Sequence, residues 1–522
     1  MKNINIKLQG IFSMVLLLIV SIAYAQPPRI CDTCKYDVEL TKGRFFTDSV
    51  DIYTPPQTTS EFSPCPASDT GLKYIGFIHG LSGSPASWSD AQEWTSNNYK
   101  TNSGKPSYVG WETSFHDVGQ EVNKQIEVDI HSKFSQTKDS RCYSNDFIIA
   151  HSQGGIGSRY LDYKWDTHKH NTDFGDRRLF YGLVTFGSPH GGAHIALTKD
   201  QHAGFITGVV DAIYLEGTYN LRGYSKKLDK LLDNKDIFIE EEMVPIMIKG
   251  LHTNTMDAMA PNSSVMDSIN NHKSRLHKVA FYGVEDAPEC WRVISNMTDV
   301  AAEDYPTWKA EPDNFFVDKA ESVRAEHLAA IQENNSKIKR WKAAGIFGRN
   351  IFSALMASYF VNKNLVENHH REEAVRFLDN ANTHWRYLIG AYHRDSFEWV
   401  NETYYELTWE EKYGWLGKWY KQTRHFNTYN ECVNHYNGLN VYRKQGWSIN
   451  AKTKPIKKQS FYPNDGVVLV KSQKAFPGVG GRIDKMEKNN HFQERNSPQT
   501  EEVLEKLYKG KYDGYFTTLR KR

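Results

Sequence analysis

A serine between small residues is the first group in this chain whose type and spacing suit chemistry. Residues 150–154 read Ala-His-Ser-Gln-Gly, after an apolar run and before a helix-like stretch. Where a strand turns sharply into a helix, the residues two before and two after the serine approach closely, so both must be small, as Ala150 and Gly154 are. The turn exposes the hydroxyl, and the helix N-terminus stabilises negative charge. A glycine-softened turn without chemistry is the alternative, but this setting favours Ser152 as a nucleophile.

A nucleophilic serine that transfers acyl groups also needs backbone N–H groups aimed at the oxyanion that forms. One should come from Gln153, the residue after the nucleophile, and the other from a loop after an early strand. The sequence His79-Gly80-Leu81 directly follows the apolar run 74–78. We therefore expect Leu81 and Gln153 to form the oxyanion hole. The alternative for residues 79–81 is an ordinary glycine turn after a strand.

The general base and its acid should follow the serine in the order Ser, Asp, His. His491, in Asn490-His491, lies 26 residues after Asp465 and is the expected general base. Asp465, in Asn-Asp-Gly, would orient the imidazole, although such a tripeptide also suits a simple hairpin turn. Asp286 is a rival acid, because it comes just after the apolar run 279–282, where the basic fold places this group.

Together these motifs resemble those of the bacterial triacylglycerol lipases of the α/β-hydrolase superfamily. The likeness covers roughly residues 72–200 and 460–495, and it includes the Phe-Gly-Ser-Pro-His-Gly-Gly stretch at 186–192. It implies hydrolysis of carboxylic esters, with the aspartate after the asparagine, Asp465, as the acid of the triad. The sequence departs from the family at Gln493, where those lipases carry an aspartate that binds calcium. We therefore expect neither a metal nor another cofactor.

Short apolar runs alternate with helix-like stretches over the first half of the chain. The expected strands are 74–78, 147–150, 183–186 and 279–282, and the expected helices include 118–133 and 155–165. Runs this short, bounded by Gly, Pro and Asp, are typical of parallel strands. The alternation predicts an α/β fold with a doubly wound, mostly parallel sheet, which is the architecture of the α/β-hydrolases.

The pattern changes after residue 312. No proline occurs from 313 to 454, apolar residues recur at helical spacing, and nine of the 13 tryptophans lie between 291 and 447. These features predict a large helical insertion before the last strand, with 467–470 returning to the sheet. We expect the insertion to cap the active site and shape an acyl pocket. The alternative is a helical subdomain that only stabilises the fold or docks a partner.

The N-terminus has the features of a secretory signal peptide. Lys2 and Lys7 precede an apolar run, and Ala23-Tyr24-Ala25 supplies a small-x-small cleavage site. The run is too short to span a membrane. We therefore expect residues 1–25 to be removed and the mature protein to be secreted or periplasmic.

The predicted organisation of the remaining chain has four parts. Residues 26–70, rich in Pro, Thr and Ser, form an extended lead-in. Residues 71–290 form the first part of the α/β-hydrolase core, 291–455 the helical insertion or cap, and 456–522 the C-terminal part of the core with acid and histidine. About 500 mature residues exceed one ordinary core, which agrees with a domain plus a large addition.

Charge and cysteine content restrict the class of protein further. The formal net charge is +2, and removing two lysines with the signal peptide lowers it to zero, so nucleic acid is not an expected partner. Six cysteines in an exported chain predict disulfides, whose pairing the sequence does not decide. Cys31 and Cys34 form a C-x-x-C motif without a surrounding βαβ pattern, which favours a structural bridge over a redox site.

Three classes of function remain open. The first is an esterase or lipase acting on a small-molecule or lipid ester with an apolar acyl group, with at most transient contact with a membrane or lipid surface. The second is an acyltransferase or amide hydrolase with the same triad. The third is a non-catalytic binding protein on a hydrolase scaffold, which the presence of both Ser152 and His491 disfavours.

Overall fold

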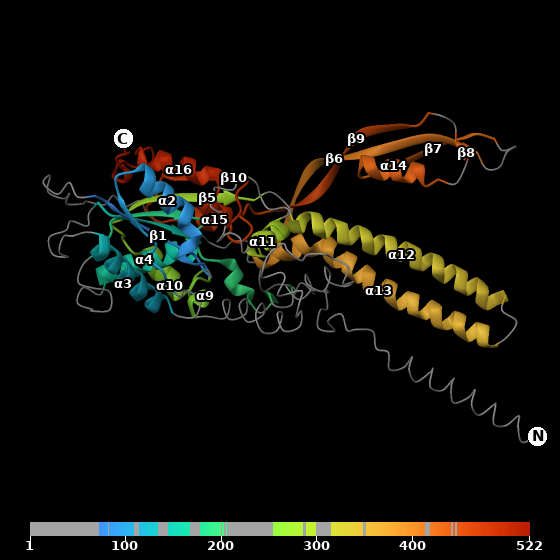
Figure 1. The fold of residues 1–522 in the computed structure, drawn as a ribbon, viewed down its shortest axis with the longest axis horizontal. Coiled ribbons are helices and arrows are strands. Elements are labelled where there is room, and N and C mark those ends of the chain that lie inside the picture. Colours follow the sequence, from blue (N-terminus) through green and yellow to red (C-terminus); the bar gives the residue numbers. More distant parts are fainter. Residues whose placement is uncertain are drawn as a thin grey trace, which may run out of the picture. The chain divides into compact units, whose positions relative to one another are not determined.

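The structure is a computed structural model of the 522-residue chain (Figure 1). It describes residues 72–81, 83–108, 114–133, 145–167, 178–199, 201–202, 205, 254–285, 289–298, 315–347, 351–412, 418–439, 442–443 and 446–521. The predicted signal peptide (1–25) and lead-in (26–70) lie outside these residues. None of the helices in the described part of the chain is long and apolar enough to cross a membrane.

A six-stranded sheet, parallel throughout, forms the centre of the larger of two compact units. Its strands, in spatial order, are β10 (Ile483–Glu487), β5 (His277–Val284), β4 (Gly182–Phe186), β3 (Phe147–His151), β1 (Tyr74–Ile78) and β2 (Asn102–Gly104). The four strands predicted from apolar runs are all present, and every residue of β1, β3 and β4 is buried. Burial on both faces explains why these strands are continuous apolar runs.

Helices cover both faces of this sheet. One face packs against α3 (Phe115–Lys133) and α4 (Gln153–Thr167), and the other against α2 (Ser89–Asn98) and α16 (Pro498–Tyr508). Alternate residues of a strand therefore enter different apolar clusters: in β3, Ile148 joins the α3–α4 cluster and Ile149 joins the α2–α16 cluster. The predicted helices 118–133 and 155–165 lie within α3 and α4, and the doubly wound α/β architecture is confirmed.

Shorter helices complete this unit around the loops of the sheet. They are the 3-10 helices η1 (Pro85–Trp88), η3 (His194–Leu197), η6 (Gln493–Arg495) and η7 (Gly514–Phe516), and the α-helices α9 (Asn254–Ala258), α10 (Ser264–Asn271), α11 (Glu289–Thr298) and α15 (Val470–Gln473).

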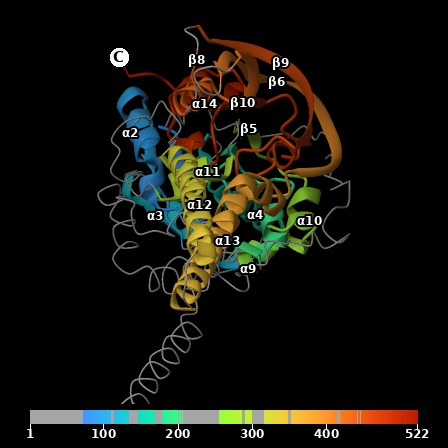
Figure 2. The same cartoon turned by 90° about the vertical axis from the view of Figure 1, so that its right-hand side faces the viewer.

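Two long helices form the first half of the predicted insertion. α12 (Phe315–Phe347) and α13 (Ile351–Leu388) run side by side in both views (Figures 1 and 2). Residues at the base of this hairpin, among them Val323, Phe377 and Trp385, belong to the same buried apolar cluster as α3 and α4. The hairpin base is therefore part of the larger unit rather than a separate domain.

The second half of the insertion is not helical, and here the prediction is wrong. Residues Tyr392–Tyr462 form a second compact unit. It is an antiparallel sheet of β6 (Tyr392–Lys412), β7 (Tyr420–Phe426), β8 (Tyr442–Arg443) and β9 (Ser448–Phe461), with α14 (Tyr429–Asn437). The absence of proline suits a paired strand as well as a helix, because proline cannot donate to a ladder.

The prediction that residues 467–470 form a strand of the sheet is also wrong. Asn464 and Leu469 form only an isolated bridge around an irregular loop, α15 begins at Val470, and the last strand is β10. The run is apolar because Val467, Val468 and Leu469 pack into buried surface, with Val468 only 3% exposed. Of the six cysteines, Cys290 and Cys432 are described, and both are buried free thiols; the other four lie outside the described residues.

Candidate active site

Ser152 occupies a sharp turn between β3 and α4. Its φ of 54° places it in the left-handed region, which few residues other than glycine adopt. The backbone N–H of Ser152 donates to the carbonyl of Phe186 (2.9 Å), which anchors the turn to the neighbouring strand β4. A strained conformation held this firmly is common at functional sites, and it is the turn that the sequence predicts for the nucleophile.

The loop after β1 lies directly against this turn. A Cβ atom on Gly80 would be 2.7 Å from the Cβ of Ser152, and one on Gly154 would be 2.4 Å from the carbonyl oxygen of His79. Both positions therefore require glycine for the close approach. The contact brings the segment of Leu81 against the turn that carries Gln153, which an oxyanion hole built from these two residues requires.

Tyr108, which the sequence analysis missed, ties these two segments together. Its hydroxyl donates to the carbonyl of His79 (2.9 Å) and lies 3.3 Å from Oε1 of Gln153. Its ring stacks on that of His79, with centroids 4.5 Å apart. Burial raises the pKa of Tyr108 above its ordinary value, so the hydroxyl keeps its proton and remains a donor.

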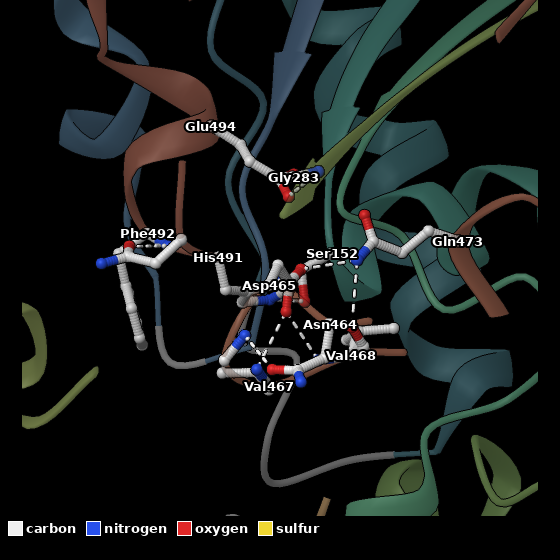
Figure 3. A network of polar contacts seen from close by, with 12 residues as sticks. Ser152, Gly283, Asn464, Asp465, Val467, Val468, Gln473, His491, Phe492 and Glu494 are labelled. Carbon is white, nitrogen blue, oxygen red and sulfur yellow. Dashed lines mark hydrogen bonds and ion pairs between the residues drawn. The ribbon is translucent and has the colours of Figure 1, made fainter. Parts of the chain in front are cut away.

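The histidine and the aspartate reach Ser152 from loops on either side of β10 (Figure 3). Nε2 of His491 lies 2.9 Å from Oγ of Ser152, and Nδ1 of His491 lies 2.7 Å from Oδ2 of Asp465. All three side chains are buried: Ser152 is 9% exposed, His491 5% and Asp465 not at all. The distances are those of direct hydrogen bonds, in the arrangement that a base between a nucleophile and an acid would need.

The carboxylate of Asp465 is enclosed by hydrogen-bond donors. Oδ1 accepts from the backbone N–H groups of Val467 (2.9 Å) and Val468 (2.6 Å). Oδ2 accepts from Nε2 of Gln473 (3.0 Å) besides the imidazole of His491. Because Oδ2 accepts from Nδ1–H of His491, the imidazole carries its proton on Nδ1 and presents Nε2 as the acceptor toward Ser152.

The strand order and the turn at Ser152 decide the architecture. The strand before the oxyanion loop lies between a short edge strand and the strand that ends at the serine, and three further parallel strands follow in sequence order. The chain has the α/β-hydrolase fold. Within it, the acid and the histidine flank the last strand, β10, and the long insertion separates β5 from the acid.

Comparisons with known proteins add no finer assignment. No family model and no curated protein matches this sequence. Among solved structures, the mature lipase BlEst2 of Bacillus licheniformis is 16% identical with a TM-score of 0.24, over 43% of this chain and 69% of that one. Lipase 1 of Pelosinus fermentans is 14% identical with a TM-score of 0.27, over 42% and 69%. At such TM-scores the likenesses carry no weight, and the assignment rests on the chain's own geometry.

The rival acid, Asp286, lies outside the described residues. Its neighbour Glu285 is described, and the backbone N–H of Glu285 donates to the carbonyl of Asn464 (2.8 Å), beside Asp465. The end of β5 therefore supports the acid loop through its backbone.

Glu494 is a second buried carboxyl behind the three residues, and the sequence analysis did not find it. It is fully buried, and its Oε1 accepts from the backbone N–H of Gly283 (2.7 Å). Burial, followed by the negative charge of Asp465, raises the pKa of Glu494 well above its ordinary value. The raised pKa favours the protonated form of Glu494, which lies beside the Asp465–His491 pair (Figure 3). The only sequence signal is an acidic residue three positions after the histidine.

His151, next to Ser152 in the chain, holds the backbone of His491 in place. Its Nε2–H donates to the carbonyl of His491 (2.7 Å), and the two rings lie 4.6 Å apart. Burial, followed by the proximity of His491, lowers the pKa of His151 well below its ordinary value. His151 is therefore neutral and acts as a fixed donor.

Among the described residues, two groups of side chains have the composition of metal ligands. Asp465, His491 and Glu494 form the first group, and they are engaged as set out above. The second is Asp162, Asp166 and His272, and Arg178 already pairs with both of its carboxylates. Gln493, at the family's calcium position, instead accepts the backbone N–H of Asn490 through its side chain (3.2 Å).

Proposed function

We propose that this protein is a serine hydrolase that cleaves carboxylic esters through an acyl-enzyme intermediate. The observation that carries the proposal is the continuous hydrogen-bonded series from Asp465 through His491 to Ser152, with Ser152 held in a left-handed turn. Such a series makes a poorly nucleophilic hydroxyl reactive, because the base is already in place to accept its proton.

The proposed reaction follows from these positions. Oγ of Ser152 attacks the acyl carbon while Nε2 of His491 takes its proton, and the backbone N–H groups of Leu81 and Gln153 stabilise the oxyanion. His491 then gives that proton to the departing alcohol. Water then attacks the acyl-enzyme while Nε2 of His491 takes its proton, and the proton returns to Oγ of Ser152 as the carboxylic acid product leaves. Asp465 holds the imidazole in the productive tautomer throughout and stabilises the imidazolium.

We infer an apolar acyl group, such as that of a lipid ester, as the substrate. The half-buried apolar side chains Leu81, Val467 and Phe492 belong to the loops that carry the oxyanion donor, the acid and the base. The predicted signal peptide supports a site of action outside the cytoplasm. An acyltransferase or an amide hydrolase would use the same three residues, and the choice of acceptor distinguishes them.

A fluorophosphonate probe tests the nucleophile. The wild-type protein should be labelled covalently and should hydrolyse p-nitrophenyl esters, and Ser152→Ala should lose both activities while keeping its melting temperature. The matched control is Ser158→Ala, on the same helix, whose hydroxyl donates only to the carbonyl of Gly154 (2.8 Å). This control should remain labelled. Labelling that persists in Ser152→Ala would place the nucleophile elsewhere.

A further inference from the structure

The acid loop has no regular secondary structure, yet one of its peptide groups is held at both ends. Residues 465–468 form bends between β9 and α15. The peptide group that joins Gly466 to Val467 has its N–H on Oδ1 of Asp465 (2.9 Å). The carbonyl of the same group, on Gly466, accepts from Nε1–H of Trp385 (2.6 Å).

The side chain of Trp385, which donates to this carbonyl, is held in place by its surroundings. It is 3% exposed and lies in the last turns of α13, where it packs against Phe205, with ring centroids 5.6 Å apart. The next residue, Arg386, forms a partly buried ion pair with Glu289 of α11 (2.8 Å). Two further hydrogen bonds hold this end of α13: Cys290 N–H to Oδ1 of Asn382 (2.9 Å), and Thr198 Oγ1 to the carbonyl of Leu388 (2.7 Å).

A peptide group is planar, so its carbonyl and its N–H point in opposite directions and rotate together. If the carbonyl of Gly466 turned away from Trp385, the N–H of Val467 would turn away from Asp465. Gly466 has a φ of +92°, and a Cβ on it would be 2.5 Å from Cγ2 of Val293. Glycine is required there, and its freedom makes rotation of the adjoining peptide group easy. The indole is the contact that opposes this rotation from the carbonyl side.

We propose that Trp385 is a positioning residue for Asp465, acting through the Gly466–Val467 peptide group. The hydrogen-bonded series would then begin in the insertion, at the indole of Trp385, and end at Oγ of Ser152. This inference rests on the proposed catalytic role of Asp465, His491 and Ser152. It gives the base of the α12–α13 hairpin a part in the reaction that is separate from any contact with substrate.

Trp385→Phe tests the proposal, because it removes the N–H donor and retains an aromatic ring. A carboxylate that is no longer held in place should lower kcat roughly tenfold to hundredfold, with KM nearly unchanged. The matched control is Trp409→Phe in the second unit, where Nε1 of a buried tryptophan donates to Oε2 of Glu411 (2.7 Å). That control should leave kcat within about twofold of wild type. Equal kcat values for Trp385→Phe and wild type would overturn the proposal.

Combining substitutions separates positioning from a general effect on stability. In the Asp465→Asn background the carboxylate is already lost, so Trp385→Phe should lower kcat no further. A full additional loss in the double variant would show that the indole acts independently of Asp465 and would overturn the proposal.

If Trp385→Phe does not fold, benzothienylalanine at position 385 keeps the indole shape without the N–H, and the same comparisons apply. Failure of the proposed function looks different: the wild-type protein itself would then show neither turnover nor labelling.

Discussion

Replacing Asp465 by Asn reveals how strongly the acid loop directs the imidazole. Every partner of the carboxylate is a donor: two backbone N–H groups on Oδ1, and the side chains of Gln473 and His491 on Oδ2. Asparagine has one oxygen and one NH₂ group. If the NH₂ group took the Oδ1 position, it would face the N–H groups of Val467 and Val468, and a backbone donor cannot become an acceptor.

The asparagine oxygen is therefore forced to the Oδ1 position, and its NH₂ group points at His491. The imidazole of His491 then adopts the tautomer with its proton on Nε2, so that Nδ1 accepts a hydrogen bond from the asparagine NH₂ group. In this tautomer Nε2 donates to Ser152 and can no longer take its proton. In serine proteases the equivalent change lowers turnover by about 10⁴-fold, which corresponds to about 5.4 kcal/mol in the activation free energy. We expect a loss of the same size here.

The assay is ester turnover at saturating substrate, measured beside the melting temperature of each variant. Asp465→Asn keeps the side-chain volume and should stay folded, but its melting temperature should fall modestly because the new NH₂ group faces Nε2 of Gln473. Asp286→Asn is the comparison, and it should retain most of the activity. If Asp286→Asn proves the more damaging of the two, the acid lies at the end of β5 and the tautomer reasoning fails.

Three further predictions concern the surroundings of the site. Glu494 has a raised pKa in the folded state, so the stability that its neutral form contributes is lost as pH rises above the unfolded value of about 4.3 and through the folded pKa. The melting temperature of Glu494→Gln should therefore rise relative to that of the wild type as pH increases over this range. A difference in melting temperature that does not change with pH would contradict the raised pKa of Glu494. EDTA should alter neither turnover nor melting temperature, and a loss reversed by calcium would reveal a site that Gln493 does not exclude. Replacing residues 328–371 by a short loop keeps Trp385 and should change the preference between short and long acyl esters; an unaltered profile would refute a role of the hairpin as a cap.

The sequence was enough to predict that Ser152, Asp465 and His491 come together, because each belongs to a local pattern with its own steric reason. Ser152 lies between two small residues at a strand end, and the order of serine, acid and histidine follows from the fold. Four of the six parallel strands, β1, β3, β4 and β5, could be predicted because their burial makes each of them a short apolar run, whereas β2 and β10 carry no such run.

The supporting residues could not be found in this way, because their roles depend on contacts between distant segments. Trp385 is 81 residues from Gly466, Tyr108 is 45 from Gln153, and Glu494 is 211 from Gly283. No local pattern records such pairs. The antiparallel unit at 392–462 was missed for another reason: its apolar side, with Leu407 and Trp409, is short and lies within a long charged strand.

The long insertion also delays the synthesis of His491 relative to that of Ser152. His491 is 339 residues beyond Ser152 in the chain. At about 5 to 20 residues per second, a ribosome needs roughly 17 to 70 s to cover that distance. For most of this interval the nascent chain contains Ser152 and the loop after β1 but neither Asp465 nor His491, and His491 follows Asp465 by a further 26 residues. Five strands of the sheet can pair before β10 is made, so we expect a partly folded chain that does not react with esters until its final strand is in place.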